Sequence, residues 1–114
     1  MSSIPDGLFG NWLLTKFNGL DLRNEVRRFR MRFSRAQNDV EVRALVVNVM
    51  SGFMEYRDGK LTGGMASTLS LAPPFFMGME NFLRNGFAAG MDVRLEGDVL
   101  TLIHGEDVLV LTAE

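Results

Sequence analysis

Residues 26–35 read VRRFRMRFSR, with five arginines in ten positions, although the 114-residue chain carries a formal net charge of −2. Apolar and basic residues alternate here: Phe29, Met31 and Phe33 have one parity, and Arg28, Arg30 and Arg32 have the other. An extended chain places the two parities on opposite faces, whereas a helix would spread the arginines around its cylinder. The stretch therefore predicts a β-strand over residues 26–33 with one apolar and one basic face.

The next stretch, residues 39–48, reads DVEVRALVVN and continues the alternation. Its small and branched apolar residues are expected to face the core of a hairpin, with Asp39, Glu41 and Arg43 facing outward. In either register that keeps both apolar faces inward, Arg32 is expected to lie opposite Asp39 or Glu41. We therefore expect ion pairs across the hairpin to neutralise much of the arginine stripe.

A candidate basic contact face remains, formed by Arg28, Arg30, Arg32 and Arg43. Three interpretations stay open: a solvated face, a contact for an acidic partner, or a contact for an anionic surface. Nucleic-acid binding is disfavoured, because the aromatic residues that could stack on bases point inward from this strand.

Turn signals recur along the rest of the chain: Asn18-Gly19, Asp58-Gly59, Gly97-Asp98 and Gly105-Glu106. Such pairs favour tight connections between antiparallel strands. The apolar runs between them predict about eight strands, at residues 10–17, 26–33, 40–48, 52–57, 60–71 with a break near Gly63-Gly64, 91–96, 99–104 and 108–111. The predicted fold class is α+β, mainly β: a compact antiparallel meander, barrel-like because closure removes the sheet edges.

One segment, residues 73–86, has a different period. Its apolar residues recur at helical spacing: Phe75, Phe76, Met79, Phe82 and Leu83. Glu80 is expected on the opposite, polar side, and Gly86 is expected to cap the C-terminus. A single helix should therefore pack against the barrel or plug it.

Phe75, Phe76, Met77 and Met79 could also form an adaptable apolar surface for a protein partner or a hydrophobic ligand. Core filling is the alternative. Residues 10–17 and the apolar runs near the C-terminus carry apolar side chains at both parities, so their outer faces require cover from the helix or from another chain.

Little in the sequence points to catalysis. Apolar residues make up 46% of the chain and charged residues 23%, as in a single globular domain that spans residues 1–114. Cysteine is absent and His104 is the single histidine, so neither a metal centre nor a nucleophilic relay is expected. The RDGK turn at residues 57–60 lacks the glycine-rich loop of a phosphate site. We expect a protein that is not an enzyme and uses no cofactor.

The N-terminus, MSSIPDG, has neither a basic nor an apolar region of a signal peptide, and no stretch is long enough to span a membrane. These features favour a cytoplasmic protein or one peripheral to secretory or membrane compartments. A monomer or a weak homodimer is expected.

Several motifs follow one another in a set order: Gly10, Trp12 and Leu14 in G-x-W-x-L, then NVMSGFMEYRDGKLTGGMASTLS, a helix with Glu80 and Phe82, and VRLEGDVLTL. This order resembles the META domain family over residues 10–111. Asn48, Gly52, Ser67 and Thr68 match positions of the family pattern, while Val47 and Ala72 stand where many bacterial members have cysteine. The family includes bacterial heat-inducible lipoproteins and small kinetoplastid proteins, and this chain is most similar to the latter.

The resemblance implies a barrel-like sheet with one helix, without established catalytic residues or a cofactor. It also implies a non-enzymatic interaction module associated with virulence, secretion or stress responses. Because the fold is similar to that of secretin-pilot proteins, a lipid or hydrophobic ligand in a cleft between barrel and helix is the alternative. The replacement of both cysteines fits an intracellular form that lacks the corresponding bridge.

Overall fold

The computed structural model describes residues 4–25 and 28–114 and contains an antiparallel barrel with one long helix. Neighbouring strands follow chain order and β10 closes the ring on β1. The ring strands are β1 (Gly10–Phe17), β3 (Arg30–Ala36), β4 (Asp39–Leu45), β5 (Val49–Arg57), β6 (Lys60–Thr62), β8 (Met91–Glu96), β9 (Val99–His104) and β10 (Asp107–Ala113). The mainly-β meander with a single α-helix, predicted from the sequence, is confirmed.

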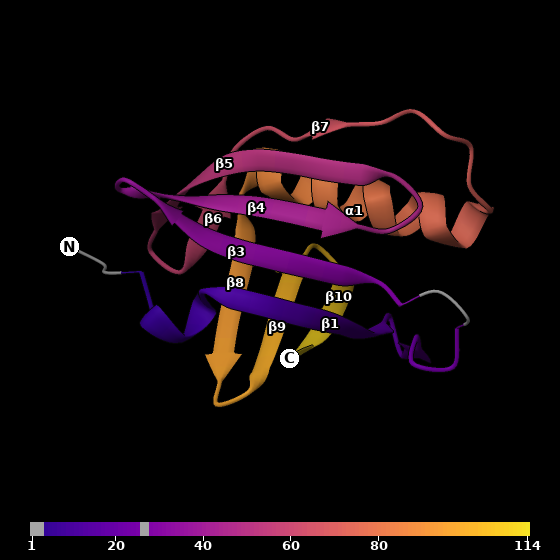
Figure 1. The fold of residues 1–114 in the computed structure, drawn as a ribbon, viewed down its shortest axis with the longest axis horizontal. Coiled ribbons are helices and arrows are strands. Elements are labelled where there is room, and N and C mark those ends of the chain that lie inside the picture. Colours follow the sequence, from indigo (N-terminus) through magenta and orange to yellow (C-terminus); the bar gives the residue numbers. More distant parts are fainter. Residues whose placement is uncertain (1–3, 26–27) are drawn as a thin grey trace.

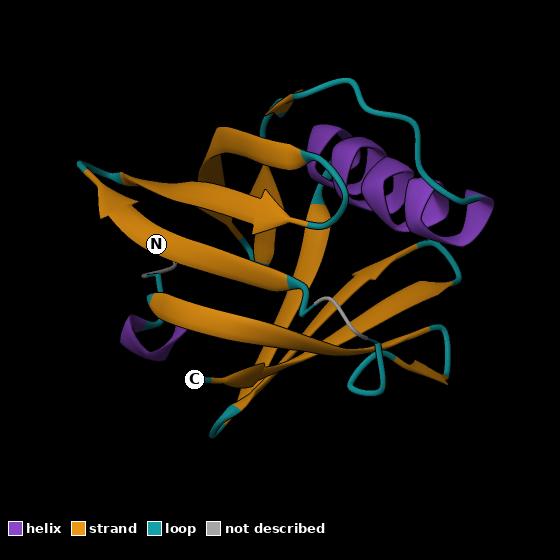
Figure 2. Ribbon diagram, turned by 45° about the vertical axis from the view of Figure 1, so that its right-hand side comes forward, coloured by secondary structure: helices purple, strands orange, loops and turns teal. Residues whose placement is uncertain are grey.

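Three short elements and the helix complete the fold: the 3-10 turn η1 (Asp6–Leu8), β2 (Leu20–Asp21), β7 (Ala66–Ser67) and α1 (Pro74–Ala89). In Figure 1, β1, β3, β4 and β5 form the front wall, and β8, β9 and β10 cross behind it. Helix α1 runs behind β4 and β5 in Figure 1, and the turned view of Figure 2 shows it beside the sheet at one end of the barrel. Its buried side chains join the inward-facing residues of the strands in one apolar core.

The strand boundaries agree with the prediction most closely where turn signals flank them. β1, β8 and β9 begin and end at the expected residues. β3 instead starts at Arg30 and continues to Ala36, so the strand expected over residues 26–33 is shifted. Of its expected first residues, Val26 and Arg27 lie outside the described part of the chain, and Arg28 and Phe29 precede the strand.

A β-bulge in β1 explains part of the mixed parity of its apolar residues. The pairing of β1 with β10 shifts register between Leu14 and Lys16. Trp12 and Leu14 point inward before the bulge and Phe17 points inward after it, which a regular strand would not allow. The indole Nε1 of Trp12 donates a hydrogen bond of 2.9 Å to the Leu8 carbonyl oxygen, which holds η1 over the core.

Helix α1 continues one turn beyond the expected end. Gly86 is a buried interior residue, and a Cβ atom there would press against the end of the Met91 side chain. Gly90, with a positive φ of 117°, follows the last helical residue, and its N–H donates to the Gly86 carbonyl. The prediction that Gly86 caps the helix is therefore wrong, because this glycine serves close packing and not chain reversal.

The break expected near Gly63-Gly64 is present, since β6 and β7 pair with two different parts of β5. Between them the chain crosses β5 at very short range. A Cβ atom on Gly52 would collide with the Gly64 carbonyl oxygen, whereas one on Gly64 would meet open space. The crossing therefore requires a glycine at Gly52 but not at Gly64.

We expect Gly52→Ala to lower the free energy of unfolding by about 2 kcal/mol, because the added methyl group has to displace backbone. Urea denaturation of the purified protein measures this. Gly64→Ala is the matched control and should leave stability unchanged or slightly raised. Equal effects of the two substitutions would contradict the close crossing.

Candidate functional site

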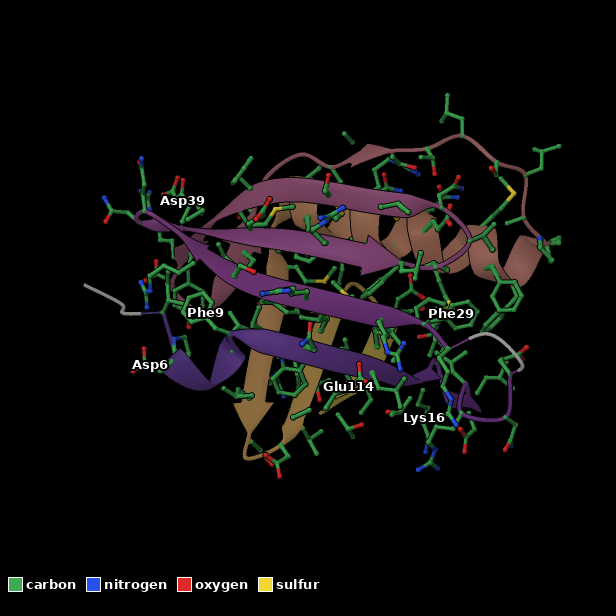
Figure 3. The ribbon with its side chains drawn as sticks, in the orientation of Figure 1. Asp6, Phe9, Lys16, Phe29, Asp39 and Glu114 are labelled. Carbon is green, nitrogen blue, oxygen red and sulfur yellow. The ribbon has the colours of Figure 1, made fainter. Side chains whose placement is uncertain are left out.

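The four apolar residues predicted as a partner surface divide between core and surface. Met79 is 1% exposed, so its inclusion in that surface is wrong. Phe75 and Phe76 are half-buried and pack edge to face, with ring centroids 5.5 Å apart. Phe76 also packs on Phe29, which lies at the end of the sheet near the start of α1 (Figure 3). Of the four, Met77 alone is exposed.

Glu80 was expected on the solvent side of α1, and this prediction is wrong. The residue is 4% exposed, and its carboxylate faces the connection between β4 and β5. One oxygen accepts the backbone N–H groups of Val47 and Asn48 at 3.1 and 2.7 Å. The other accepts from Asn48 Nδ2 at 2.8 Å. Three donors thus offset much of the cost of burying the carboxylate.

The same Asn48 side chain also forms hydrogen bonds with residues 68–70, which precede the helix. Its Oδ1 accepts from Thr68 Oγ1 at 2.8 Å and from the Ser70 N–H at 2.7 Å, and its Nδ2 also donates to the Ser70 carbonyl. Asn48 therefore joins the β4–β5 connection, residues 68–70 and α1 in one network. The family pattern marks Asn48 and Thr68, but no signal in this single sequence links either residue to Glu80.

Three arginines of the predicted basic face, Arg30, Arg32 and Arg43, lie on the outer side of the sheet, whereas Arg28 precedes β3. The partners expected for Arg32 are wrong. Arg32 lies opposite Arg43, while Glu41 lies opposite Ser34 and Asp39 opposite Ala36. Asp39 is at the tip of the β3–β4 hairpin, away from the stripe (Figure 3). The two-residue turn at Gln37-Asn38 sets this register, with Gln37 at a positive φ of 56°.

The charges on this face are only partly neutralised. Arg30 Nε bonds Glu114, which lies near β1 (Figure 3), at 2.9 Å. Among the ion pairs within residues 4–25 and 28–114, none involves Arg28, Arg32 or Arg43. Like charges directly opposite each other on neighbouring strands destabilise a sheet. The Arg32–Arg43 pair is therefore a local cost to the fold.

Arg23 shows the contrasting situation of an arginine with a partner. Its guanidinium donates to Asp21 at 2.8 Å and, mainly through this side-chain bond, lowers the pKa of that carboxyl to about 2. Arg32 and Arg43 lack such a neighbour in the described part of the chain.

Exposed apolar side chains flank the arginines on the same outer surface. Leu45 lies opposite both Arg30 and Val49, and Phe53, 63% exposed, lies opposite Glu41. A depression of about 300 Å³ opens between the arginines and the Leu45–Val49 pair. We call this surface the arginine face; it comprises Arg30, Arg32, Arg43, Leu45, Val49 and Phe53.

Other kinds of site have little support. His104 is half-buried at the end of β9, and the described residues contain no group of three His, Asp or Glu side chains that could hold a metal ion. No described helix has both the length and the hydropathy of a membrane span.

Comparisons with known proteins agree with the fold. The sequence matches the META domain family over residues 7–114. No curated protein sequence matches the chain significantly. A solved structure titled "NMR structure of the protein" is similar with a TM-score of 0.78 and 21% sequence identity, covering 92% of this chain and 89% of that chain. At this identity the likeness shows the fold alone.

We expect Glu80→Gln to lower the free energy of unfolding by about 2 kcal/mol, because an amide nitrogen would replace an oxygen that accepts buried N–H groups. Urea denaturation measures the loss, and amide hydrogen exchange should accelerate at Val47, Asn48 and Ser70. Asn81→Gln, at an exposed position on the same helix, is the control and should change stability by less than about 0.5 kcal/mol. Unchanged exchange at Ser70 would contradict the network.

Proposed function

The chain belongs to the META domain family, and from this premise we propose that it works as a protein-interaction module that binds its partner through the arginine face. The family match is consistent with a module that binds rather than catalyses. The association with virulence, secretion or stress responses, which the sequence resemblance implies, stays a prediction.

The opposed arginines carry the proposal. Arg32 and Arg43 face each other from adjacent strands, and a carboxylate or a neutral polar residue at either position would remove their repulsion. A barrel under selection for stability alone has no use for such a pair. A binding site does have a use for such a pair, because residues that bind a partner are often retained although they lower stability.

The chemistry of the arginine face favours a partner segment that carries both carboxylates and apolar side chains. Guanidinium groups bind carboxylates in a bidentate manner. The exposed Leu45, Val49 and Phe53 offer apolar area around them, and the depression between these groups can receive a side chain. Apolar contact would supply affinity, and the arginines would supply orientation and a fast, salt-dependent association.

A protein partner fits this surface better than an anionic membrane. Glu41 lies on the same outer side of the sheet, and the whole chain has 14 acidic against 12 basic residues. Adhesion to anionic lipid relies on a cluster of several unopposed basic residues. The arginine face is smaller and mixed in sign, as suits recognition of one segment.

The alternative function, binding of a lipid or hydrophobic ligand between barrel and helix, has weaker support. Met79, Phe82, Leu83 and Phe87 of α1 are buried in the core at the position where such a ligand would lie. The depression of about 300 Å³ lies on the outer side of β3 and β4. A smaller one of about 190 Å³ beside α1 has a mixed lining that includes Asn48, Glu80 and Arg84.

We expect Arg43→Glu to raise the free energy of unfolding by about 0.5 kcal/mol at low salt, because it converts a repulsive cross-strand pair into an attractive one. Chemical denaturation at low and high salt measures the gain, which should shrink as salt is added. Arg94→Glu, at an exposed position of β8 on another wall of the barrel, makes the same change in charge and should give no such gain.

The proposed contact is tested by cross-linking in extracts of the native cell, followed by mass spectrometry. Wild type should form a salt-sensitive cross-link between β3–β5 and an acidic segment of one protein. The double variant Arg32→Glu with Arg43→Glu should lose it, and Arg94→Glu should keep it. Equal cross-linking by all three proteins would contradict the proposal. Salt-sensitive binding to phosphatidylserine vesicles, lost in the double variant, would assign the face to a membrane instead.

A further inference from the structure

A second exposed feature borders the arginine face at Val49, whose backbone bonds Thr68. It comprises the last residue of β7 and the four residues after it, and we call these residues, 67–71, the rim segment. β7 pairs with β5 on one side. In Figures 1 and 2, β7 and the chain after it run along the outer boundary of the molecule, and no described element lies beyond them. β7 is therefore an open sheet edge, and residues 68–71 of the rim segment continue from it as irregular chain.

The hydrogen bonds show which backbone groups of this edge are occupied. The Thr68 N–H donates to the Val49 carbonyl at 3.1 Å, and the backbone N–H and carbonyl of Ser70 both bond the Asn48 side chain. Thr68 and Ser70, two residues apart, thus both turn backbone groups toward β5 and Asn48, and we expect Leu69 and Leu71 to direct theirs to the opposite side. The backbone groups of Leu69 and Leu71 form no hydrogen bond within the described chain.

The leucine side chains of the rim segment are also exposed to solvent. Leu69 is 95% exposed and Leu71 is 93% exposed. Residues 61–79 contain no charged residue. Natural sheet edges are usually protected from association by charges, bulges or covering elements. The rim segment has no charged side chain to protect it. The Asn48 side chain fixes its position through hydrogen bonds to the Ser70 backbone.

We propose that the rim segment pairs with the same segment of a second copy of this chain, as antiparallel strands related by a two-fold axis at Leu69. This register sets Leu69 opposite Leu69 and Leu71 opposite Ser67, so that outward backbone groups meet outward backbone groups. An uncharged segment meets no electrostatic repulsion from its own copy, which a strand with charges would. The position on the outer boundary also lets the two barrels extend away from each other (Figure 1).

The pairing is expected to be weak and reversible. Five residues per chain bury far less area than a permanent dimer interface, which places the dissociation constant in roughly the micromolar to millimolar range. The arginine face lies on the front wall and not on this edge, so a dimer would present two such faces together. Two linked contacts strengthen binding to a repeated or dimeric partner without any new contact.

Sedimentation equilibrium over a range from low micromolar to millimolar protein tests the pairing. Wild type should show a reversible monomer–dimer equilibrium. Leu69→Lys, which sets two charges opposite each other, should weaken it by at least about tenfold. Leu20→Lys makes the same change at a half-exposed leucine of β2 and should leave it unaltered. Since Leu69 is almost fully exposed, its variant should fold normally, which the circular dichroism spectrum checks.

Amide hydrogen exchange gives a second measurement. Protection of the Leu69 and Leu71 amides should increase with protein concentration, and a synthetic peptide of residues 66–72 should compete with dimer formation. A monomer at all concentrations would overturn the proposal, and so would a dimer that Leu69→Lys leaves intact. Dimerisation accompanied by protection at the arginine face instead would also overturn it.

Discussion

The alternation of side chains in a closed sheet around a single core is the constraint on which the other features of this protein depend. Met31 and Phe33 of β3, like Val42 and Ala44 of β4, have to face inward. A one-residue slip would expose all of them, so the register is fixed by the core and by the two-residue turn. Once that register is set, Arg32 and Arg43 can only face outward and toward each other. The chemistry of the surface thus follows from the packing of the interior.

The buried Glu80 carboxylate makes a second, polar connection where the apolar core ends. It receives hydrogen bonds from the β4–β5 connection, and Asn48 carries the connection on to residues 68–70. A buried carboxylate is costly unless its donors are all in place, so such a network favours one arrangement of its parts over nearby alternatives. Here it positions α1 relative to the sheet, and it holds the rim segment at the edge with Leu69 and Leu71 exposed.

The sequence predicts the structure best where local chemistry determines it. β1, β8 and β9 were predicted to the residue because turn glycines flank them. The β3–β4 register differs from the predicted one because Gln37 adopts a positive φ, which glutamine does not usually favour and which its residue type therefore does not predict. The end of α1 was missed because Gly86 has a local pattern typical of a cap but a tertiary role in packing.

The site was harder to predict than the fold, since its residues are defined by what faces them across the structure. Glu80 lies at a polar position of the helical pattern, and only its neighbours on the β4–β5 connection show that it is buried. The parity of the arginine stripe predicts its outward face, but its lack of partners depends on a register two residues beyond the nearer of the two expected ones, because Arg32 lies opposite Arg43 and not Glu41.

We infer that the core forces two arginines into a repulsive pair that serves binding and not stability. A double-mutant cycle with Arg32→Gln and Arg43→Gln, singly and together, measures this repulsion directly by urea denaturation at low and high salt. We expect an unfavourable coupling between the two arginines of about 0.3 to 1 kcal/mol at low salt that fades at high salt. A coupling of zero at low salt, or a favourable one, would contradict it.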